Sequence, residues 1–319
     1  MKKTEFYFDS RDGLTKIHAV RYEPEEQALV NGKPVAVLQI IHGMSEYVER
    51  YEETAKYFTE HGFVVTGEDH LGHGGSVAEG GVYGYFCEQD PATVTVRDVH
   101  RLKKMTQELY PGVPYFILGH SMGSFMLRNY ICRYGTGIQG AIIMGTGHNT
   151  ALQVVFGKAL AAEQKCFGGD KRKSTVLHNL VFGSANKRIS NPKSENAWLS
   201  CNEENVAKYD ADEKCGFVFT VNGFATLFEL VARATKPENV EKIPKDLPVF
   251  LVAGEQDPIG NYGEGVKFVY DQLDNAGLEH LAVKLYENDR HEILNEDDGQ
   301  QVMQDLYEWI LAKLPEENS

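Results

Sequence analysis

Two hydrophobic patterns alternate along most of this 319-residue chain. Short, nearly unbroken runs of aliphatic and β-branched residues are typical of strands buried on both faces, and they occur at 35–43, 63–70, 115–118, 140–144, 246–254 and 280–286. Between these runs, apolar positions recur with the spacing of one helix face at 47–61, 91–110, 125–134, 263–275 and 297–314. The alternation predicts right-handed crossovers and a mostly parallel central sheet flanked by helices.

Two stretches depart from this alternation. At the start, residues 6–23 alternate polar and apolar side chains around Asp12-Gly13, which predicts a β-hairpin. Between residues 148 and 233 there are apolar clusters but no clear buried strand, so we expect several helices that form a lid. The predicted organisation is a core made of residues 1–147 and 234–319, interrupted by a helical lid (cap) insertion at 148–233.

The stretch from Pro114 to Gly135 places a serine between a predicted strand and a predicted helix. Gly119 and Gly123 flank that serine and allow a very tight bend, so that the hydroxyl of Ser121 projects above the end of the strand. The same bend presents the backbone N–H of Met122 at a helix N-terminus, where negative charge is favoured. The pattern predicts a nucleophile elbow beside an anion site. The alternative interpretation is an ordinary surface turn.

A serine hydroxyl becomes a good nucleophile only when a base takes its proton, and that base needs an orienting carboxylate. On this topology the acid and then the histidine are expected after later strands, where Asp257 and His291 stand. Asp289, close to His291 on one loop, is an alternative acid, and Glu255 is a weaker one. The alternative bases do not follow the last predicted strand, and we expect them to be structural: His42, His70, His73, His120 and His148.

The second oxyanion donor is expected in the loop after the first buried run, where Met44 follows His42-Gly43. We therefore predict an oxyanion hole made of the backbone N–H groups of Met44 and Met122. His70 and His73 are also readable as a metal pair, but no third ligand is spaced to join them. The expected chemistry needs no metal and no organic cofactor.

Composition narrows the class of partner and the compartment. The formal net charge of −14 opposes encounters with nucleic acid and with anionic membranes, although it leaves apolar contact with lipid open. The five cysteines are irregularly spaced, which favours reduced thiols over a disulfide framework. No apolar stretch has the length of a signal peptide core or of a spanning helix. We therefore expect a cytoplasmic protein without stable membrane insertion.

Taken together, five motifs resemble the monoacylglycerol lipase and lysophospholipase-like branch of the serine α/β-hydrolases: HGMSEYVERY (42–51), EDHLGHGGS (68–76), GHSMGS (119–124), GEQDPIG (254–260) and RHEILNE (290–296). The resemblance covers nearly the whole chain and implies the α/β-hydrolase fold with a helical lid. It implies Ser121 as nucleophile, Asp257 as acid and His291 as base. It also implies the amides of Met44 and Met122 as oxyanion donors.

The expected activity is hydrolysis of a carboxylic ester through an acyl-enzyme. The Phe and Val clusters of 148–233 suggest an apolar acyl channel and a monoacylglycerol-like or lysophospholipid-like substrate, unless they pack the lid onto the core. A short-chain esterase, a thioesterase or acyl-transfer enzyme, and a proline-type aminopeptidase would use the same triad. The last would hold a substrate amine on acidic lid residues, for which the candidates are Glu163, Asp170, Glu195, Glu203, Glu204 and Asp210, although an exposed acidic face explains these residues as well. A serine at position 121 argues against haloalkane or epoxide chemistry, and the complete triad argues against a non-catalytic receptor.

Overall fold

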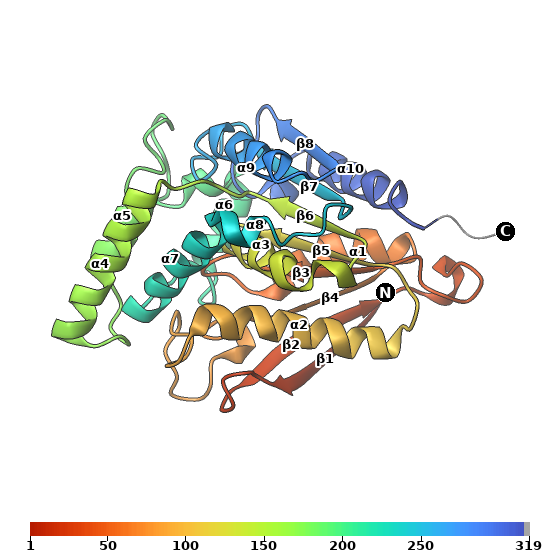
Figure 1. Ribbon diagram of the computed structural model, residues 1–319, viewed down its shortest axis with the longest axis horizontal. Helices are drawn as coiled ribbons and strands as arrows, with labels where there is room; N and C mark the ends of the chain where they lie inside the picture. The colour runs from red at the N-terminus through yellow and green to blue at the C-terminus, as the bar shows by residue number, and fades with distance from the viewer. Residues whose placement is uncertain (316–319) are drawn as a thin grey trace.

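The computed structural model describes residues 1–315 and is built around an eight-stranded sheet in the order β1-β2-β4-β3-β5-β6-β7-β8 (Figure 1). β1 (Lys2–Asp9) and β2 (Lys16–Glu23) form an antiparallel hairpin, and β2 pairs antiparallel with β4 (Val64–Glu68). The remaining pairings are parallel and join β4 to β3 (Val37–Ile41), β5 (Tyr115–His120), β6 (Gly140–Met144), β7 (Val249–Gly254) and β8 (Leu281–Tyr286). The predicted hairpin and the predicted mostly parallel sheet are confirmed.

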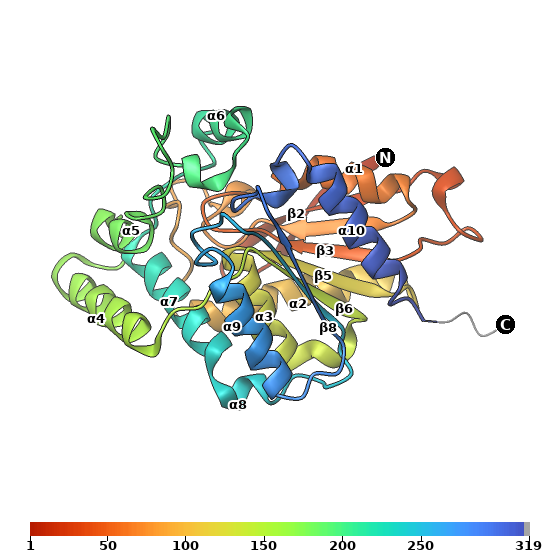
Figure 2. The ribbon, with the colours of Figure 1, turned by 90° about the horizontal axis from the view of Figure 1, so that it is seen from above.

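Helices cover both faces of this sheet (Figure 2). α1 (Glu52–Glu60) and α10 (Gly299–Leu311) lie on one face, and α2 (Pro91–Leu109), α3 (Met122–Tyr134) and α9 (Glu264–Asn275) lie on the other. Because successive side chains of a strand point to opposite faces, the run of β3 supplies both cores. Val37 and Ile41 pack toward α2 and α3, whereas Leu38 and Ile40 pack toward α1 and α10.

The helix expected at 47–61 is shorter than predicted. Its first turn, Val48–Tyr51, is a 3₁₀ turn, and α1 begins only at Glu52. The backbone N–H of Val48 donates to the carboxylate of Asp69, so the start of this turn is tied to the loop after β4, while the N–H of Arg50 bonds the carbonyl oxygen of Tyr47 within the turn. The pattern of apolar spacing carries no information about such a distant contact.

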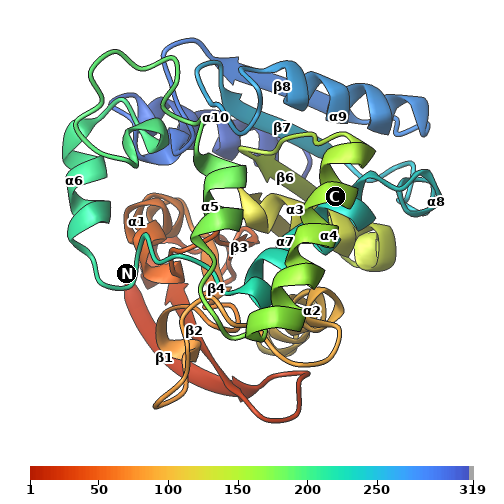
Figure 3. The ribbon, with the colours of Figure 1, turned by 90° about the vertical axis from the view of Figure 1, so that its left-hand side faces the viewer.

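Between β6 and β7 the chain forms helices, as the sequence predicts: α4 (Ala151–Gly168), α5 (Thr175–Phe182), α6 (Glu203–Ala211), α7 (Val221–Thr235) and the short α8 (Pro237–Val240). We call residues 148–233 the inserted segment. α4 and α5 lie at one end of the molecule, and Figure 3 looks onto that end with these two helices in front.

The apolar residues of the inserted segment serve mainly to attach it. α7 packs between α3 and α4, and Val154, Phe224 and Leu230 are buried in the same core cluster as α2 and α3. Other apolar side chains of α4 point to solvent, among them Leu152 and Phe156. Within residues 1–315, none of the helices combines the length and apolar character needed to cross a bilayer.

Candidate active site

Ser121 lies in the tight bend that the sequence predicts between β5 and α3. Its backbone has φ 53° and ψ −119°, a conformation that costs free energy in a residue other than glycine. The flanking glycines explain how the bend closes. A Cβ on Gly119 would lie 2.4 Å from the carbonyl oxygen of Gly123, and one on Gly123 would lie 2.1 Å from that of Ile41. Side chains at either position would therefore prevent this geometry.

His291 and Asp257 form a buried pair beside this bend. The imidazole Nδ1 donates to Asp257 Oδ2 at 2.8 Å, and the two residues are 1% and 0% exposed. The other carboxylate oxygen, Oδ1, accepts from the backbone N–H of Ile259 at 2.8 Å. These bonds fix the orientation of the imidazole and use its Nδ1, so that only Nε2 remains available for another partner. Nε2 is buried and has no hydrogen-bond partner among residues 1–315.

The alternative acids do not contact this imidazole. Asp289 has one buried carboxylate oxygen without a partner in the described chain, and burial together with neighbouring carboxylates raises its pKa to about 7. Glu255 is exposed. The structure therefore brings Asp257, and not Asp289 or Glu255, to His291.

The loop after β3, which carries Met44, is held by buried histidines. His42 Nδ1 donates to the carbonyl oxygen of Gly43, and its Nε2 accepts from the backbone N–H of His70. His73 Nε2 accepts from the backbone N–H of Ser45. Burial lowers the pKa of His42 to about 4 and that of His73 to about 3, so these rings are neutral near pH 7 and can accept such bonds. These histidines act as loop supports, and among residues 1–315 no three His, Cys, Asp or Glu side chains are grouped as a metal site.

The two backbone amides predicted for an oxyanion hole lie on either side of the serine bend. Met44 lines the same pocket as Ser121, and a Cβ on its neighbour Gly43 would lie 3.1 Å from Ser121 Cβ. Met122 is the first residue of α3, so its N–H has no acceptor within the helix. The structure thus brings the loop after β3 beside Ser121, which directly precedes α3.

His120, which the sequence predicts to be structural, bonds to residues far away in the chain. Its Nδ1 lies 3.0 Å from the hydroxyl of Tyr51 and 3.2 Å from Glu46 Oε1, and its Nε2 donates to the carbonyl oxygen of His291 at 3.2 Å. Burial alone lowers the pKa of His120, but the bond to Glu46 outweighs it and the pKa is raised. His120 is the last residue of β5, and the sheet places this end between the loops after β3 and β8.

Glu46, which His120 contacts, belongs to a buried ionic cluster that also contains Arg50 and Glu292. Arg50 donates from NH1 to Glu46 at 2.8 Å and from both terminal nitrogens to Glu292 at 2.7 and 2.8 Å. Burial alone lowers the pKa of Arg50, but the two carboxylates outweigh it and hold the pKa well above its usual value. Sequence reasoning missed the cluster, although all three residues stand in the motifs HGMSEYVERY and RHEILNE.

The inserted segment contacts the same cluster. Asn205 of α6 donates to Glu292 at 2.8 Å, and the hydroxyl of Tyr209 donates to the carbonyl oxygen of Ser45 at 3.0 Å. The Tyr209 ring also lies 4.9 Å from the guanidinium of Arg50. Earlier in the segment, the Trp198 ring lies 5.1 Å from that of His291. The inserted segment therefore forms the roof over the histidine loop and over the loop after β3.

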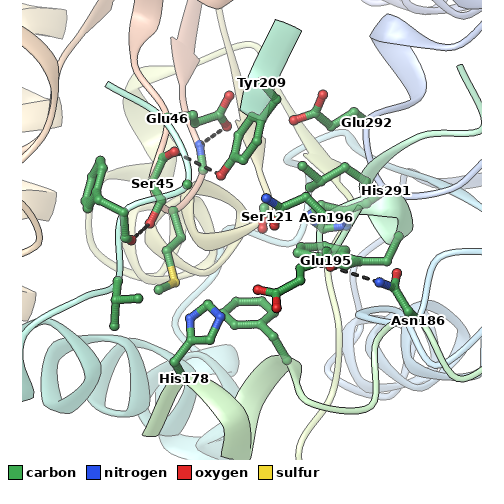
Figure 4. A pocket seen from close by; sticks show the side chains of 18 of the residues that line it. Ser45, Glu46, Ser121, His178, Asn186, Glu195, Asn196, Tyr209, His291 and Glu292 are labelled. Carbon is green, nitrogen blue, oxygen red and sulfur yellow. Dashed lines mark hydrogen bonds between the residues drawn. The ribbon is translucent and has the colours of Figure 1, made fainter. Parts of the chain in front are cut away.

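Ser121 and His291 share a pocket of about 370 Å³. Figure 4 shows them between Glu46 and Glu292 on one side and His178 on the other. The inserted segment supplies apolar lining residues (Phe182, Trp198, Leu199, Phe217 and Val218) and polar ones (His178, Asn179, Asn186, Glu195, Asn196 and Tyr209). His178 Nδ1 and Asn186 Oδ1 are buried without a partner in the described chain. The wall is thus mixed, and apolar spacing in the sequence signals only its apolar half.

The sheet order and the serine bend between β5 and α3, with a histidine–carboxylate pair after β8 and β7, are those of an α/β hydrolase. A family model described as "Serine aminopeptidase, S33" matches residues 32–298. The chain belongs to this family.

The relatives and solved structures agree with this class. The chain is 30% identical to the "Monoglyceride lipase homolog" of Monkeypox virus over 88% of this chain and 91% of the relative, and 26% identical to the "Monoglyceride lipase" of Mus musculus over 89% and 85%. The crystal structure of a thermostable carboxyl esterase from Bacillus coagulans, in complex with glycerol, superimposes with a TM-score of 0.89 at 31% identity and covers 98% of this chain and 99% of that one. The chain is a carboxylester hydrolase of the monoglyceride lipase-like branch of the α/β hydrolases, and the predicted fold class, branch and enzyme class are confirmed.

Proposed function

We propose that Ser121, His291 and Asp257 form a catalytic triad that hydrolyses a monoacylglycerol-like or lysophospholipid-like ester. The observation that carries the proposal is that a serine in a strained bend and an imidazole with a free, buried Nε2 share one pocket. The other imidazole nitrogen is already committed to the Asp257 carboxylate. This is the arrangement that a serine nucleophile needs in order to lose its proton.

In the proposed mechanism, His291 Nε2 accepts the proton of the Ser121 hydroxyl as its oxygen attacks the ester carbonyl carbon. Asp257 holds the imidazole by the Nδ1–H bond and stabilises its charged form. The imidazolium then gives its proton to the leaving alcohol as the carbon–oxygen bond breaks. Water attacks the acyl-enzyme by the same steps, which releases the acid and restores the serine.

The backbone N–H groups of Met44 and Met122 are proposed to hold the oxyanion that develops at the carbonyl oxygen. Support comes from their positions, because the loop that carries Met44 contacts Ser121 and Met122 begins α3. A helix N-terminus favours negative charge. Removal of one such donor typically costs roughly 3 to 4 kcal/mol of barrier.

A lipid-like monoester fits the mixed character of the pocket. Phe182, Phe217 and Val218 offer contact to an acyl chain, while Asn186 and Glu195 offer polar partners to a hydroxylated leaving group. The names of the relatives, monoglyceride lipases, support the same substrate class. We propose that the inserted segment, residues 148–233, is the lid that selects between acyl chains and alcohols, because it supplies most of this wall.

A proline-type aminopeptidase is the second candidate, and Glu195 is the observation that favours it. This carboxylate lies in the pocket wall contributed by the inserted segment, where a substrate amine would meet it. The family model is described by the name of a serine aminopeptidase. Glu195 is exposed at the mouth of the pocket, however, so water also satisfies it, and the ester hydrolase is favoured.

The test is steady-state hydrolysis of a chain-length series of p-nitrophenyl esters and monoacylglycerols by the wild-type protein and Ser121→Ala. We expect activity with medium or long acyl chains, and its loss in Ser121→Ala together with loss of fluorophosphonate labelling. Activity on acetate or butyrate alone would contradict the lipid assignment and retain the triad. Hydrolysis of aminoacyl amides in place of esters would favour the aminopeptidase.

A further inference from the structure

Arg128 of α3 is a buried charge without a carboxylate partner. Its side chain is 2% exposed, and its four acceptors in residues 1–315 are neutral oxygens. NH1 donates to the hydroxyl of Thr146 at 3.4 Å and to the carbonyl oxygen of Gly147 at 3.3 Å. NH2 donates to the carbonyl oxygen of Ala234 at 3.3 Å and to the side-chain oxygen of Gln272 at 3.4 Å.

A buried guanidinium without a carboxylate partner stabilises a core poorly. Burial lowers the pKa of Arg128 to about 10, so the guanidinium is still charged near neutral pH. A well-packed apolar side chain of similar volume is often at least as stabilising at a buried ionic position. The charge is therefore better explained by what its donors hold together than by a contribution to overall stability.

The backbone acceptors of Arg128 lie at the two ends of the inserted segment. Gly147 directly precedes the inserted segment, and Ala234 directly follows it. The guanidinium is a planar fork with separate donors, and here NH1 is used for the entry of the segment and NH2 for its exit. Gln272 extends the exit contact, because its amide nitrogen donates to the carbonyl oxygen of Thr235 at 2.9 Å. We call residues 146–148 and 233–235 the neck of the inserted segment.

The neck is also packed against the loop that carries Asp257. A Cβ on Gly147 would lie 2.3 Å from the carbonyl oxygen of Ile259, so the two backbones are in direct contact. The backbone N–H of Ile259 in turn donates to Asp257 Oδ1 at 2.8 Å. A shift of the neck would reach the pocket wall through the inserted segment, whereas Asp257 keeps its own hydrogen bond to His291.

We propose that Arg128 is a positioning residue that ties the two ends of the inserted segment together at the neck and thereby fixes the pocket wall over Ser121. The placement of the neck rests on contacts alone. Its kinetic consequence rests on the proposed function. Lysine cannot replace arginine here, because a single ammonium lacks the two-sided fork that reaches both chain segments.

Hydrogen–deuterium exchange of the full-length protein tests the proposal without any substrate. We compare wild type, Arg128→Lys and Arg128→Met with the control Asn129→Ala, which loses a bond to the carbonyl oxygen of Leu230 in the middle of α7 and leaves the neck intact. We expect peptides covering 146–154 and 231–240 to exchange about tenfold faster in both Arg128 variants, as for a loss of roughly 1.4 kcal/mol of local protection. Peptides of β3 and β5 should stay protected in all four proteins.

Two results would overturn the proposal. One is unchanged exchange at the neck in the Arg128 variants. The other is a uniform rise over α3 and the sheet, which would indicate a purely global role. If the Arg128 variants fail to fold, Gln272→Leu is the substitute, because it removes the side chain that bonds both Arg128 and the carbonyl oxygen of Thr235 at the exit. Faster exchange at both 231–240 and 146–154 then supports a tie through Arg128, and faster exchange at 231–240 alone, or at neither, contradicts it.

Kinetics separate this proposal from the proposed function. In Arg128→Lys we expect KM for the best ester to rise about fivefold and kcat to stay within about twofold, since the reacting groups keep their geometry while the pocket wall is displaced. The same fall in kcat and in kcat/KM would contradict positioning of the wall. A wild-type protein without esterase activity whose neck peptides behave as expected would refute the function and leave the neck proposal standing.

Discussion

Residues 1–315 contain two buried histidine–aspartate pairs of almost identical geometry. In one, His291 Nδ1 lies 2.8 Å from Asp257 Oδ2, and in the other, His18 Nδ1 lies 2.8 Å from Asp69 Oδ2. The histidines are 1% and 5% exposed, and each pair has a serine nearby. Only what surrounds the second ring nitrogen and the serine distinguishes them.

The pair His18–Asp69, which we call the edge pair, has neighbours that bond to both of its residues. Ser76 donates its hydroxyl hydrogen to the carbonyl oxygen of Asp69 at 2.6 Å and accepts from the backbone N–H of His18 at 2.9 Å. His18 Nε2 lies 3.6 Å from a carboxylate oxygen of Glu5. By contrast, His291 Nε2 has no partner within residues 1–315. We propose that such a pair alone is a structural device, and that catalysis requires an open ring nitrogen beside a serine hydroxyl.

The sharpest test of this contrast replaces each histidine in turn. His291→Ala should lower kcat by about 10⁴-fold or more, as for removal of the base of a serine triad. His18→Ala should keep kcat within about threefold and lower the free energy of unfolding by about 1–3 kcal/mol, because it leaves buried partners of the imidazole unsatisfied. Ester hydrolysis and urea unfolding measure both. Equal loss of activity in the two variants would contradict the assignment of roles.

The carboxylates give a second test. Asp257→Asn should reduce kcat by about 10³–10⁴-fold, because an amide no longer selects the tautomer that leaves Nε2 free to accept a proton. Asp289→Asn should leave kcat near the wild-type value, since Asp289 does not contact His291 in the structure. Steady-state kinetics of both variants on one ester measure the two values of kcat. A larger loss of kcat in Asp289→Asn than in Asp257→Asn would identify Asp289, and not Asp257, as the acid that orients His291.

The ionic cluster beside His291 should be important for stability. Arg50→Met leaves the buried carboxylates of Glu46 and Glu292 without their cation, so we expect a loss of about 3–5 kcal/mol in the free energy of unfolding. The exposed pair Glu204–Lys208 on α6 is the matched control, and Lys208→Met should cost only about 0–1 kcal/mol. Urea unfolding of both variants measures the difference, and similar losses would show that the cluster is not specially stabilising.

The smallest expected effect is a pH dependence from the edge pair. The hydrogen bond to Asp69 raises the pKa of His18 above its ordinary value of 6.5. The stability that this pair contributes is therefore fully present below pH 6.5 and is lost as the pH rises through the raised pKa. The difference in unfolding free energy between wild type and His18→Gln should shrink from pH 6 to pH 9. A difference that grows over this range would contradict the sign of the shift.

Much of the fold and part of the candidate site could be predicted from local sequence patterns. The strands, the helices over the sheet and the bend at Ser121 follow from apolar runs, helical spacing and paired glycines, which act over a few residues. The partners of His120 and the cluster of Arg50 with Glu292 could not be predicted, because they join segments 69 to 242 residues apart. No spacing rule covers such distances. The 3₁₀ turn at Val48–Tyr51 was not predicted either, and the start of this turn is tied to Asp69 on another loop.

The sequence by itself determined the class of this protein: a parallel sheet with a serine at a glycine-flanked bend, an acid and a histidine in the right order, and a helical segment between two strands. These features are read from neighbours along the chain. The tertiary structure decided which carboxylate reaches His291, why His18 and Asp69 are not a second site, and how Arg128 meets both ends of the inserted segment. Those outcomes depend on distances and burial across the fold, and they arise only when the sheet brings the ends of its strands together.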